Sequence, residues 1–307
     1  MNSAWHWVSI GTADLEAALA FWVGKLGFEE IGVAEGDDPG LRAHWRLPDQ
    51  KVVRQAMIRA PRAAFGAIHL VEWGGTTESV RAAAAVFDLC PKNLDIYVDD
   101  LPRRMAELAE QGVAFRNKQY SEAVSPDGVH FREIHLAGHD DINLVLLQIL
   151  GSETPVPATG FYGVGPLVCI VQDPASEKRF CQQVLGLALS HDNILAGPEI
   201  EQMIGLPQGC ALEVSIWAEP GQPLGEVELV TYQGTEGADR YPRARPGSRG
   251  VTHLNWWVED IEALSSHLSS HGVTYRSSQF EGCLIQTHTT LAFRSPAGLR
   301  IEAHTAI

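Results

Sequence analysis

The sequence has no long apolar run and few basic residues. It contains no stretch of about 18 consecutive apolar residues, the length that a membrane-spanning helix needs. Lys and Arg together number 23 against 38 Asp and Glu, which gives a formal charge of −15. A negative charge of this size argues against binding to nucleic-acid backbones or to anionic lipid surfaces. We therefore expect neither a nucleic acid nor a membrane as a partner.

Cysteines are few and scattered, and they form no Cys-x-x-Cys pair. They are Cys90, Cys169, Cys181, Cys210 and Cys283. An odd, dispersed set of this kind is typical of free thiols in a reducing compartment. The first ten residues lead directly into an apolar, alternating run, without the basic region and apolar core of an export signal. These features predict a cytoplasmic protein.

The main feature of the chain is a fourfold repeat. An Asp begins and a Gly closes four helix-like stretches: Asp14 to Gly27, Asp100 to Gly112, Asp173 to Gly186 and Asp260 to Gly272. An apolar-rich run with an alternation of period two, typical of a strand, precedes each Asp. Asp is a favoured helix N-cap, and Gly readily takes the left-handed conformation that ends a helix. Strand-like sequence follows each Gly, so each unit of roughly 55 to 80 residues is predicted to be a βαβββ module.

The spacing within the repeats alternates. Asp and Gly are 13 residues apart in units one and three, and 12 apart in units two and four. This order suggests a duplicated pair, so we expect unit one to pair with unit two and unit three with unit four. The 307 residues, 45% of them apolar, are enough for two such domains, at 1–150 and 151–307. The segment 151–165, rich in Gly, Pro, Ser and Thr, is the expected linker.

Three segments resemble the vicinal oxygen chelate superfamily, which includes glyoxalase I, extradiol dioxygenases and methylmalonyl-CoA epimerase. They are Asp14 through Phe28, Arg179 through Leu187, and the Pro-Ala-Gly turn at 296–298 with the strand through Glu302. The resemblance covers nearly the whole chain. It implies an α+β fold of four βαβββ modules, which form two tandem domains with cupped sheets. It also implies a divalent metal inside a cup, held by side chains from the first and fourth strands of each module.

The resemblance places four ligand positions in each predicted domain. In the C-terminal domain they fall on Pro166, Glu228, His253 and Glu302. In the N-terminal domain they fall on Trp7, His69, Asn93 and Asn143. The C-terminal domain is therefore the predicted metal site, with His253, Glu302 and Glu228 as ligands. A carboxylate on an inward strand position is costly unless it is paired or bound to a metal.

Some of these assignments have plain alternatives. Glu228 and Glu226 lie two residues apart and point to the same face, so one of them could simply be solvated. His69 completes a set of two His and one carboxylate, which suits non-haem Fe(II), only if unit one pairs with unit four. The alternating spacing disfavours that pairing, so an ordinary core or surface His is the main alternative for His69.

Four further residues are candidates for the site. His288 resembles in its placement the acid–base histidines of extradiol enzymes, and an exposed strand His is its alternative. His304 shares the face of Glu302 and is a candidate for the substrate pocket. Trp257 and Phe293 are candidate walls for an aromatic substrate, although such residues more often belong to a core.

The extradiol pattern is incomplete. Pro166 replaces the first metal-binding His, and Ala292 stands where that family has a Tyr. The leading expectation is nevertheless a metal-dependent extradiol-type dioxygenase that acts on a small, metal-chelating, aromatic substrate. Fe(II) is favoured, with Mn(II), Ni(II) or Zn(II) as alternatives. A non-oxidative glyoxalase, epimerase or lyase type of enzyme comes next, then a metal-free protein that binds a small ligand. Whether the chain forms a homo-oligomer is left open.

Overall fold

The computed structural model describes the whole chain except residues 2, 76, 153 and 307 and the side chain of residue 141. Units one and two occupy its first half. Unit one consists of β1 (Trp7–Thr12), α1 (Leu15–Trp22), β2 (Glu29–Glu35), α2 (Pro39–Trp45), β3 (Val52–Arg59) and β4 (Ala67–Trp73). Unit two consists of β5 (Pro91–Val98), α3 (Leu101–Glu110), β6 (Ser121–Val124), β7 (His130–Ala137), a 3-10 turn (His139–Asp141) and β8 (Asn143–Ile149).

Units three and four follow the same plan. Unit three consists of β9 (Phe161–Ile170), α4 (Pro174–Gln183), β10 (Ala188–Ala196), α5 (Pro198–Ile204), β11 (Ala211–Ala218) and β12 (Glu226–Gln233). A 3-10 turn (Tyr241–Arg243) leads to unit four, which consists of β13 (Gly250–Trp257), α6 (Ile261–Ser270), β14 (Tyr275–Glu281), β15 (Gln286–Arg294) and β16 (Arg300–Ala306). Units one and three each carry a short extra helix, α2 or α5, between their second and third strands.

The repeated Asp residues cap the helices as predicted. Asp14 accepts a hydrogen bond from the backbone N–H of Ala17 at 3.0 Å, and Asp260 accepts one from Ala263 at 2.8 Å. Asp100 and Asp173 make the equivalent bonds. All four repeat glycines have φ between 69° and 76°, the left-handed region that favours Gly.

The pairing of the units differs from the expectation. One eight-stranded sheet has the order β14-β15-β16-β13-β1-β4-β3-β2, which joins unit one to unit four. The other has the order β10-β11-β12-β9-β5-β8-β7-β6, which joins unit two to unit three. The expected pairing of one with two and three with four is therefore wrong, and neither 1–150 nor 151–307 forms a sheet of its own. The Asp-to-Gly spacing reports helix length and carries no information on strand pairing.

Side-chain hydrogen bonds fix β1 against β13. Asn255 on β13 donates to the hydroxyl of Ser9 at 3.0 Å, and Thr252 donates to the backbone carbonyl of Ser9 at 3.0 Å. The indole N–H of Trp256 donates to the carbonyl of Ser3 at 3.0 Å. All three are largely buried, so they hold the first unit of the chain on the last.

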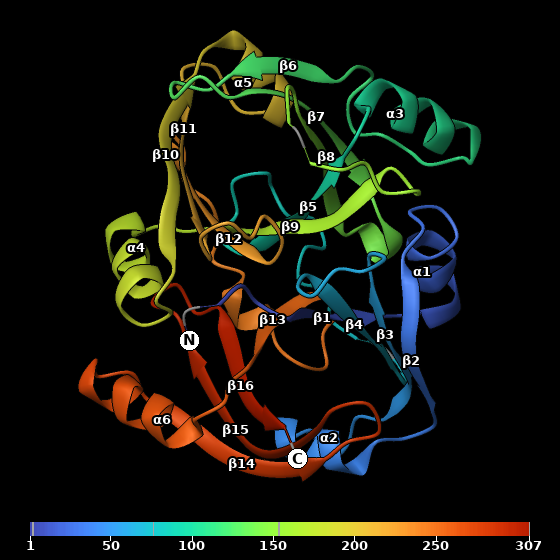
Figure 1. Ribbon diagram of the computed structural model, residues 1–307, viewed down its shortest axis with the longest axis vertical. Coiled ribbons are helices and arrows are strands. Elements are labelled where there is room, and N and C mark those ends of the chain that lie inside the picture. Colours follow the sequence, from blue (N-terminus) through green and yellow to red (C-terminus); the bar gives the residue numbers. More distant parts are fainter. Residues whose placement is uncertain (2, 76, 153, 307) are drawn as a thin grey trace.

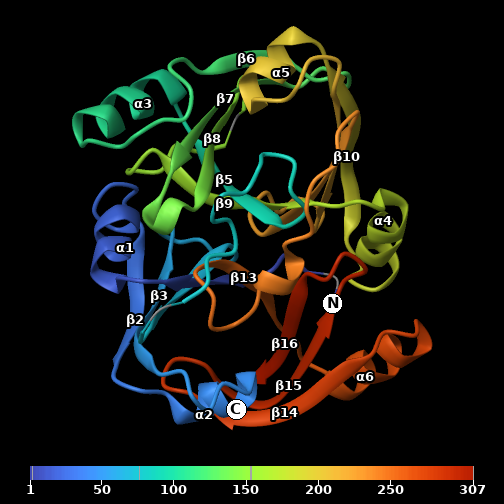
Figure 2. The ribbon, with the colours of Figure 1, turned by 180° about the vertical axis from the view of Figure 1, so that it is seen from behind.

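The two sheets are curved and lie back to back. Figures 1 and 2 show the sheet of units one and four in the lower half of the molecule and the sheet of units two and three in the upper half, with their central strands adjacent. Alternate residues such as Val8, Leu94, Leu167 and Leu254 form one continuous core between the convex faces. The remaining faces are two concave surfaces: the outer-unit cup (units one and four) and the inner-unit cup (units two and three).

The α+β class with four βαβββ modules and two cupped sheets is confirmed. Within the described residues, no helix is long and apolar enough to cross a membrane.

Candidate functional site

The actual pairing brings three of the predicted metal ligands together in the outer-unit cup. His69 on β4, His253 on β13 and Glu302 on β16 are all almost completely buried there. His253 Nε2 lies 3.8 Å from Glu302 Oε2. His304, a predicted pocket residue, lies in the same cup, with its Nε2 3.9 Å from that oxygen. Glu228 lies on β12, in the inner-unit cup, and does not join this group.

The Glu302 carboxylate is surrounded by donors that the chain itself supplies. His44 Nε2 lies 2.9 Å from Oε2, Trp45 Nε1 donates to Oε1 at 3.2 Å, and Arg300 Nε donates to Oε1 at 2.7 Å. Burial favours the neutral acid. The charges of His44 and Arg300 outweigh that effect and hold the pKa of Glu302 well below its ordinary value. Glu302 is therefore a buried carboxylate whose charge is already compensated.

Three histidines of this cup, His69, His253 and His304, are held in place by neutral partners. His69 Nε2 contacts the side-chain oxygen of Gln55 at 2.9 Å, and His253 Nδ1 contacts the hydroxyl of Thr252 at 2.8 Å. Burial lowers the pKa of His69 to about 4 and that of His304 to about 3, and it lowers the pKa of His253 well below the ordinary value. Near neutral pH these rings are uncharged inside the protein.

Helix α2 closes the outer-unit cup. The buried Asp38 caps it by accepting a hydrogen bond from the N–H of Leu41 at 2.8 Å. The same carboxylate accepts bonds from the side chain of Gln55 and the backbone N–H of Cys283, each at 2.7 Å. These bonds tie α2 to β3 and to the turn between β14 and β15. The helix thereby inserts His44 and Trp45 between the two halves of the sheet.

Two buried histidine nitrogens of the outer-unit cup are free to bind a divalent metal, but the surroundings of Glu302 oppose one. His253 Nε2 and His69 Nδ1 are buried nitrogens without a hydrogen-bond partner, as metal ligands can be. However, both oxygens of Glu302 are already occupied, and the Arg300 guanidinium beside them would repel a cation. Among the described residues, no three His, Cys, Asp or Glu side chains form a group that could hold a metal ion. The arrangement around Glu302 therefore does not fit a metal.

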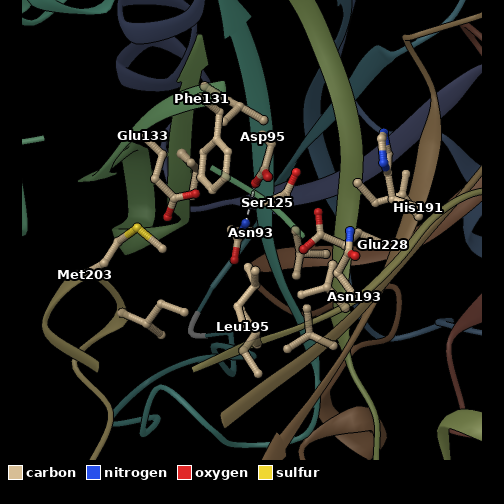
Figure 3. A pocket seen from close by; sticks show the side chains of 18 of the residues that line it. Asn93, Asp95, Ser125, Phe131, Glu133, His191, Asn193, Leu195, Met203 and Glu228 are labelled. Atoms are coloured by element: carbon tan, nitrogen blue, oxygen red, sulfur yellow. Dashed lines mark hydrogen bonds between the residues drawn. The ribbon is translucent and has the colours of Figure 1, made fainter. Parts of the chain in front are cut away.

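The inner-unit cup holds an open pocket instead (Figure 3). Its cavity volume is about 160 Å³. An apolar cavity of about 150 Å³ can hold benzene, so a single ring is the natural size of an occupant. The walls are mostly apolar and include Phe131, Val145, Leu147, Leu195, Met203 and Val214.

The floor of the pocket is acidic. Asp95 on β5, Glu133 on β7 and Glu228 on β12 all line the pocket, and Figure 3 shows their carboxylates around Asn93. Asn93 donates a short hydrogen bond to Asp95. His135 Nε2 lies 3.3 Å from the carboxylate of Glu133. Glu228 accepts no hydrogen bond from any described residue, although it is partly buried.

Burial perturbs the ionisable groups of this floor. It raises the pKa of Asp95 well above the ordinary value, and the charges of Glu228 and Glu133 add to the effect. Burial also raises the pKa of Glu228 to about 8, again reinforced by Glu133. It lowers the pKa of Lys92 to about 8, and Lys92 Nζ donates to the hydroxyl of Tyr232 at 2.6 Å. In the empty pocket, burial therefore favours the uncharged forms of Asp95, Glu228 and Lys92, because charge there carries an energetic cost.

The remaining predicted site residues lie elsewhere. His288 is exposed on β15 and makes no hydrogen bond or ion pair with the described residues. Phe293 belongs to the core behind the sheet, with its ring centroid 6.4 Å from that of Phe180, and it is not among the residues that line the pocket of the inner-unit cup. Trp257 lies at the rim of the outer-unit cup, 36% exposed, with its ring 5.7 Å from that of His304.

Several residues that shape the two cups were not predicted. In the outer-unit cup they are His44, Trp45 and Arg300, which surround Glu302. In the inner-unit cup they are Asp95 and Glu133. The period-two rule could have found Asp95, because it is two residues from Asn93, a predicted ligand position, and so shares its face.

Comparison with known proteins identifies the fold. No family model and no curated protein matches the chain by sequence. Among solved structures, glyoxalase I from Zea mays matches with a TM-score of 0.64 and 12% identity, over 98% of this chain and 92% of that one. A putative dioxygenase from Bacillus subtilis matches with a TM-score of 0.61 and 14% identity, over 98% of this chain and 84% of that one.

The chain therefore has the fold of the vicinal oxygen chelate superfamily, as its resemblance predicted. At these identities the likeness carries the fold alone. The activity has to be argued from the two cups of this chain.

Proposed function

We propose that this protein binds a ring-sized, largely apolar small molecule in the pocket of the inner-unit cup, and that it does so without a metal. The observation that supports this most directly is the contrast between the two cups. The inner-unit cup holds a cavity of about 160 Å³ with apolar walls and a polar floor. Such a combination is the usual form of a small-molecule site.

The outer-unit cup supports the same proposal by being filled. Trp45 packs there in one buried cluster with Trp7, Leu41 and Trp73. Its ring centroid lies 5.7 Å from that of Trp73 and 5.5 Å from that of His253. Because α2 takes up this space, the outer-unit cup acts as a second core that stabilises the fold.

A metal-dependent enzyme is the second candidate, of the extradiol dioxygenase or the glyoxalase, epimerase or lyase type. The observation in its favour is that His69, His253 and Glu302 converge in one cup, with one unpartnered nitrogen on each His. It ranks second because the Glu302 carboxylate already has its donors and Arg300 stands beside it. The favoured Fe(II) and the alternative Mn(II), Ni(II) and Zn(II) all need that carboxylate.

A pocket-filling variant tests the proposal. Val214 lines the pocket on β11, and Val214→Trp places a large ring in the cavity without touching the acidic floor. The matched control is Val53→Trp, at an exposed valine on β3, the equivalent strand of unit one. Thermal and chemical unfolding are followed with a panel of single-ring compounds of positive, neutral and negative charge.

We expect at least one compound to stabilise the wild type and the Val53→Trp control. The gain should be roughly 1.4 kcal/mol at a ligand concentration tenfold above Kd. Val214→Trp should lose this stabilisation while remaining folded. If no compound binds, or if binding survives in Val214→Trp, the pocket is not the ligand site.

A further inference from the structure

The pocket floor gathers three carboxylates from three different strands. Asp95, Glu133 and Glu228 come from β5, β7 and β12, so both units contribute to the cluster. Asp95 is only 6% exposed, and its one side-chain donor is Asn93. Burying an ionised carboxylate of this kind in an apolar cup costs free energy unless a positive charge or further hydrogen-bond donors compensate it.

A lysine lines the same pocket, and its charge acts on Asp95, Glu133 and Glu228. Lys92 is the cation of the floor, and its amine is directed to the hydroxyl of Tyr232 at 2.6 Å. Among the described residues, no Lys or Arg forms an ion pair with Asp95, Glu133 or Glu228. The nearest ionisable partner is His135 Nε2, at 3.3 Å from Glu133.

The outer-unit cup shows how this protein compensates a buried carboxylate when it is part of a core. Glu302 receives donors from Arg300, Trp45 and His44, each within 3.2 Å. The inner-unit cup contains more carboxylates and supplies far fewer donors. It also stays open on its concave side, where Glu228 is left without a donor. A cationic group that enters the pocket would supply the compensation that the chain leaves out, and would favour the ionised carboxylates.

We infer that the ligand of the inner-unit cup carries a positively charged nitrogen, which lies between Asp95, Glu133 and Glu228 while its apolar body contacts the walls. This inference rests on the proposed function, because it needs the pocket to be a ligand site. The ligand class is a primary or secondary amine on a single ring. The ring fits walls such as Phe131 and Leu147, and those apolar walls do not suit a hydrated metal ion.

Other titratable groups line the pocket beside the three carboxylates. They are Lys92, Tyr97, His135, His191 and Tyr232; Glu226 lies outside the lining and contacts it through Tyr97. Glu226 accepts a hydrogen bond from Tyr97 at 2.9 Å, so that pair is satisfied. Burial raises the pKa of Glu226 to about 7, so it favours the protonated form of this carboxyl as it does that of Asp95 and Glu228. A bound ammonium reverses that preference for the nearest carboxylates.

Three probes of one shape test the inference: 2-phenylethylamine, 2-phenylethanol and phenylacetate. Their binding to the full chain is measured by calorimetry near pH 7.5. We expect the amine to bind about tenfold or more tightly than the alcohol, and phenylacetate not to bind, because a charge-assisted hydrogen bond outweighs a neutral one. The isosteric variants Glu228→Gln and Glu133→Gln should each weaken binding of the amine by about tenfold and change the affinity for the alcohol much less.

The outcomes separate the inference from the proposed function. If the alcohol or phenylacetate binds as tightly as the amine, and Val214→Trp abolishes that binding, the pocket is a ligand site but the inference is wrong. Equal amine affinity in Glu228→Gln, Glu133→Gln and wild type also overturns it. If none of the three probes binds, the inference fails, and the wider panel decides the proposed function.

Discussion

Glu302→Ala is expected to destabilise the protein by about 3–5 kcal/mol, the usual cost of removing one partner from a buried ion pair. The substitution leaves the guanidinium of Arg300 and the ring of His44 without their acceptor in a cup that is closed to water. Chemical denaturation monitored by tryptophan fluorescence measures the loss. The experiment is run in chelator, so that a metal cannot contribute to the difference.

Two further variants serve as controls for the result with Glu302→Ala. Glu302→Gln keeps the shape of the side chain but removes its charge, and we expect it to lose less stability than Glu302→Ala. Glu30→Ala, at an exposed Glu on β2, should stay within about 0.5 kcal/mol of wild type. A loss of less than about 1 kcal/mol in Glu302→Ala would mean that the network around Glu302 does not form in solution.

Trp45→Ala is expected to have the second large effect, a loss of about 3–5 kcal/mol in the free energy of unfolding, as is usual for a buried Trp. The indole is 7% exposed, and it donates to Glu302 at 3.2 Å. Its removal leaves a cavity under α2 and takes one donor from the carboxylate. Equilibrium unfolding in denaturant, analysed with a common slope, gives the difference.

The controls separate packing from hydrogen bonding. Trp45→Phe keeps most of the ring but lacks the N–H, so it should lose only part of the stability that Trp45→Ala loses. Trp257→Ala removes an indole that is 36% exposed at the rim of the same cup, and we expect a much smaller loss. Near-equal losses in Trp45→Ala and Trp257→Ala would show that α2 does not fill the cup.

The sequence was sufficient to predict the four βαβββ modules, because the residues that begin and end each helix act locally. A capping Asp and a left-handed Gly act within one helix, so Asp14 or Gly272 could be interpreted from their neighbours alone. Strand pairing depends on contacts between distant segments, such as that of Asn255 with Ser9. Those contacts leave no pattern in the spacing of the repeats, and the pairing of the units was therefore missed.

The site was predicted only in part, because some of its residues follow from a local strand pattern and others depend on contacts between distant segments. Counting along strands placed His69, His253 and Glu302 on inward positions, and the structure does bring them together. What the strands could not show is that α2, from another part of unit one, inserts His44 and Trp45 beside Glu302. This insertion turns an apparent ligand set into a compensated core.

The inner-unit cup was underestimated because its residues come from two units that were expected to lie in different domains. Glu228 was interpreted as a partner of His253, whereas the structure places it in the pocket with Asp95 and Glu133. Once the pairing is known, the three carboxylates follow from period-two alternation on their strands.

The central claim is that the inner-unit cup takes the ligand and that the outer-unit cup is a metal-free core. Two methionines report on the two cups. Met203 lines the pocket, and Met57 lies opposite His69 in the ladder of β3 and β4. The most direct measurement is therefore methyl NMR of the protein labelled at its four methionines, with 2-phenylethylamine and with stoichiometric Co(II) added separately.

We predict that the amine shifts the Met203 methyl signal and leaves Met57 in place, and that Co(II) broadens neither signal. A Met57 signal broadened by Co(II), together with a Met203 signal that no ligand moves, would contradict the account.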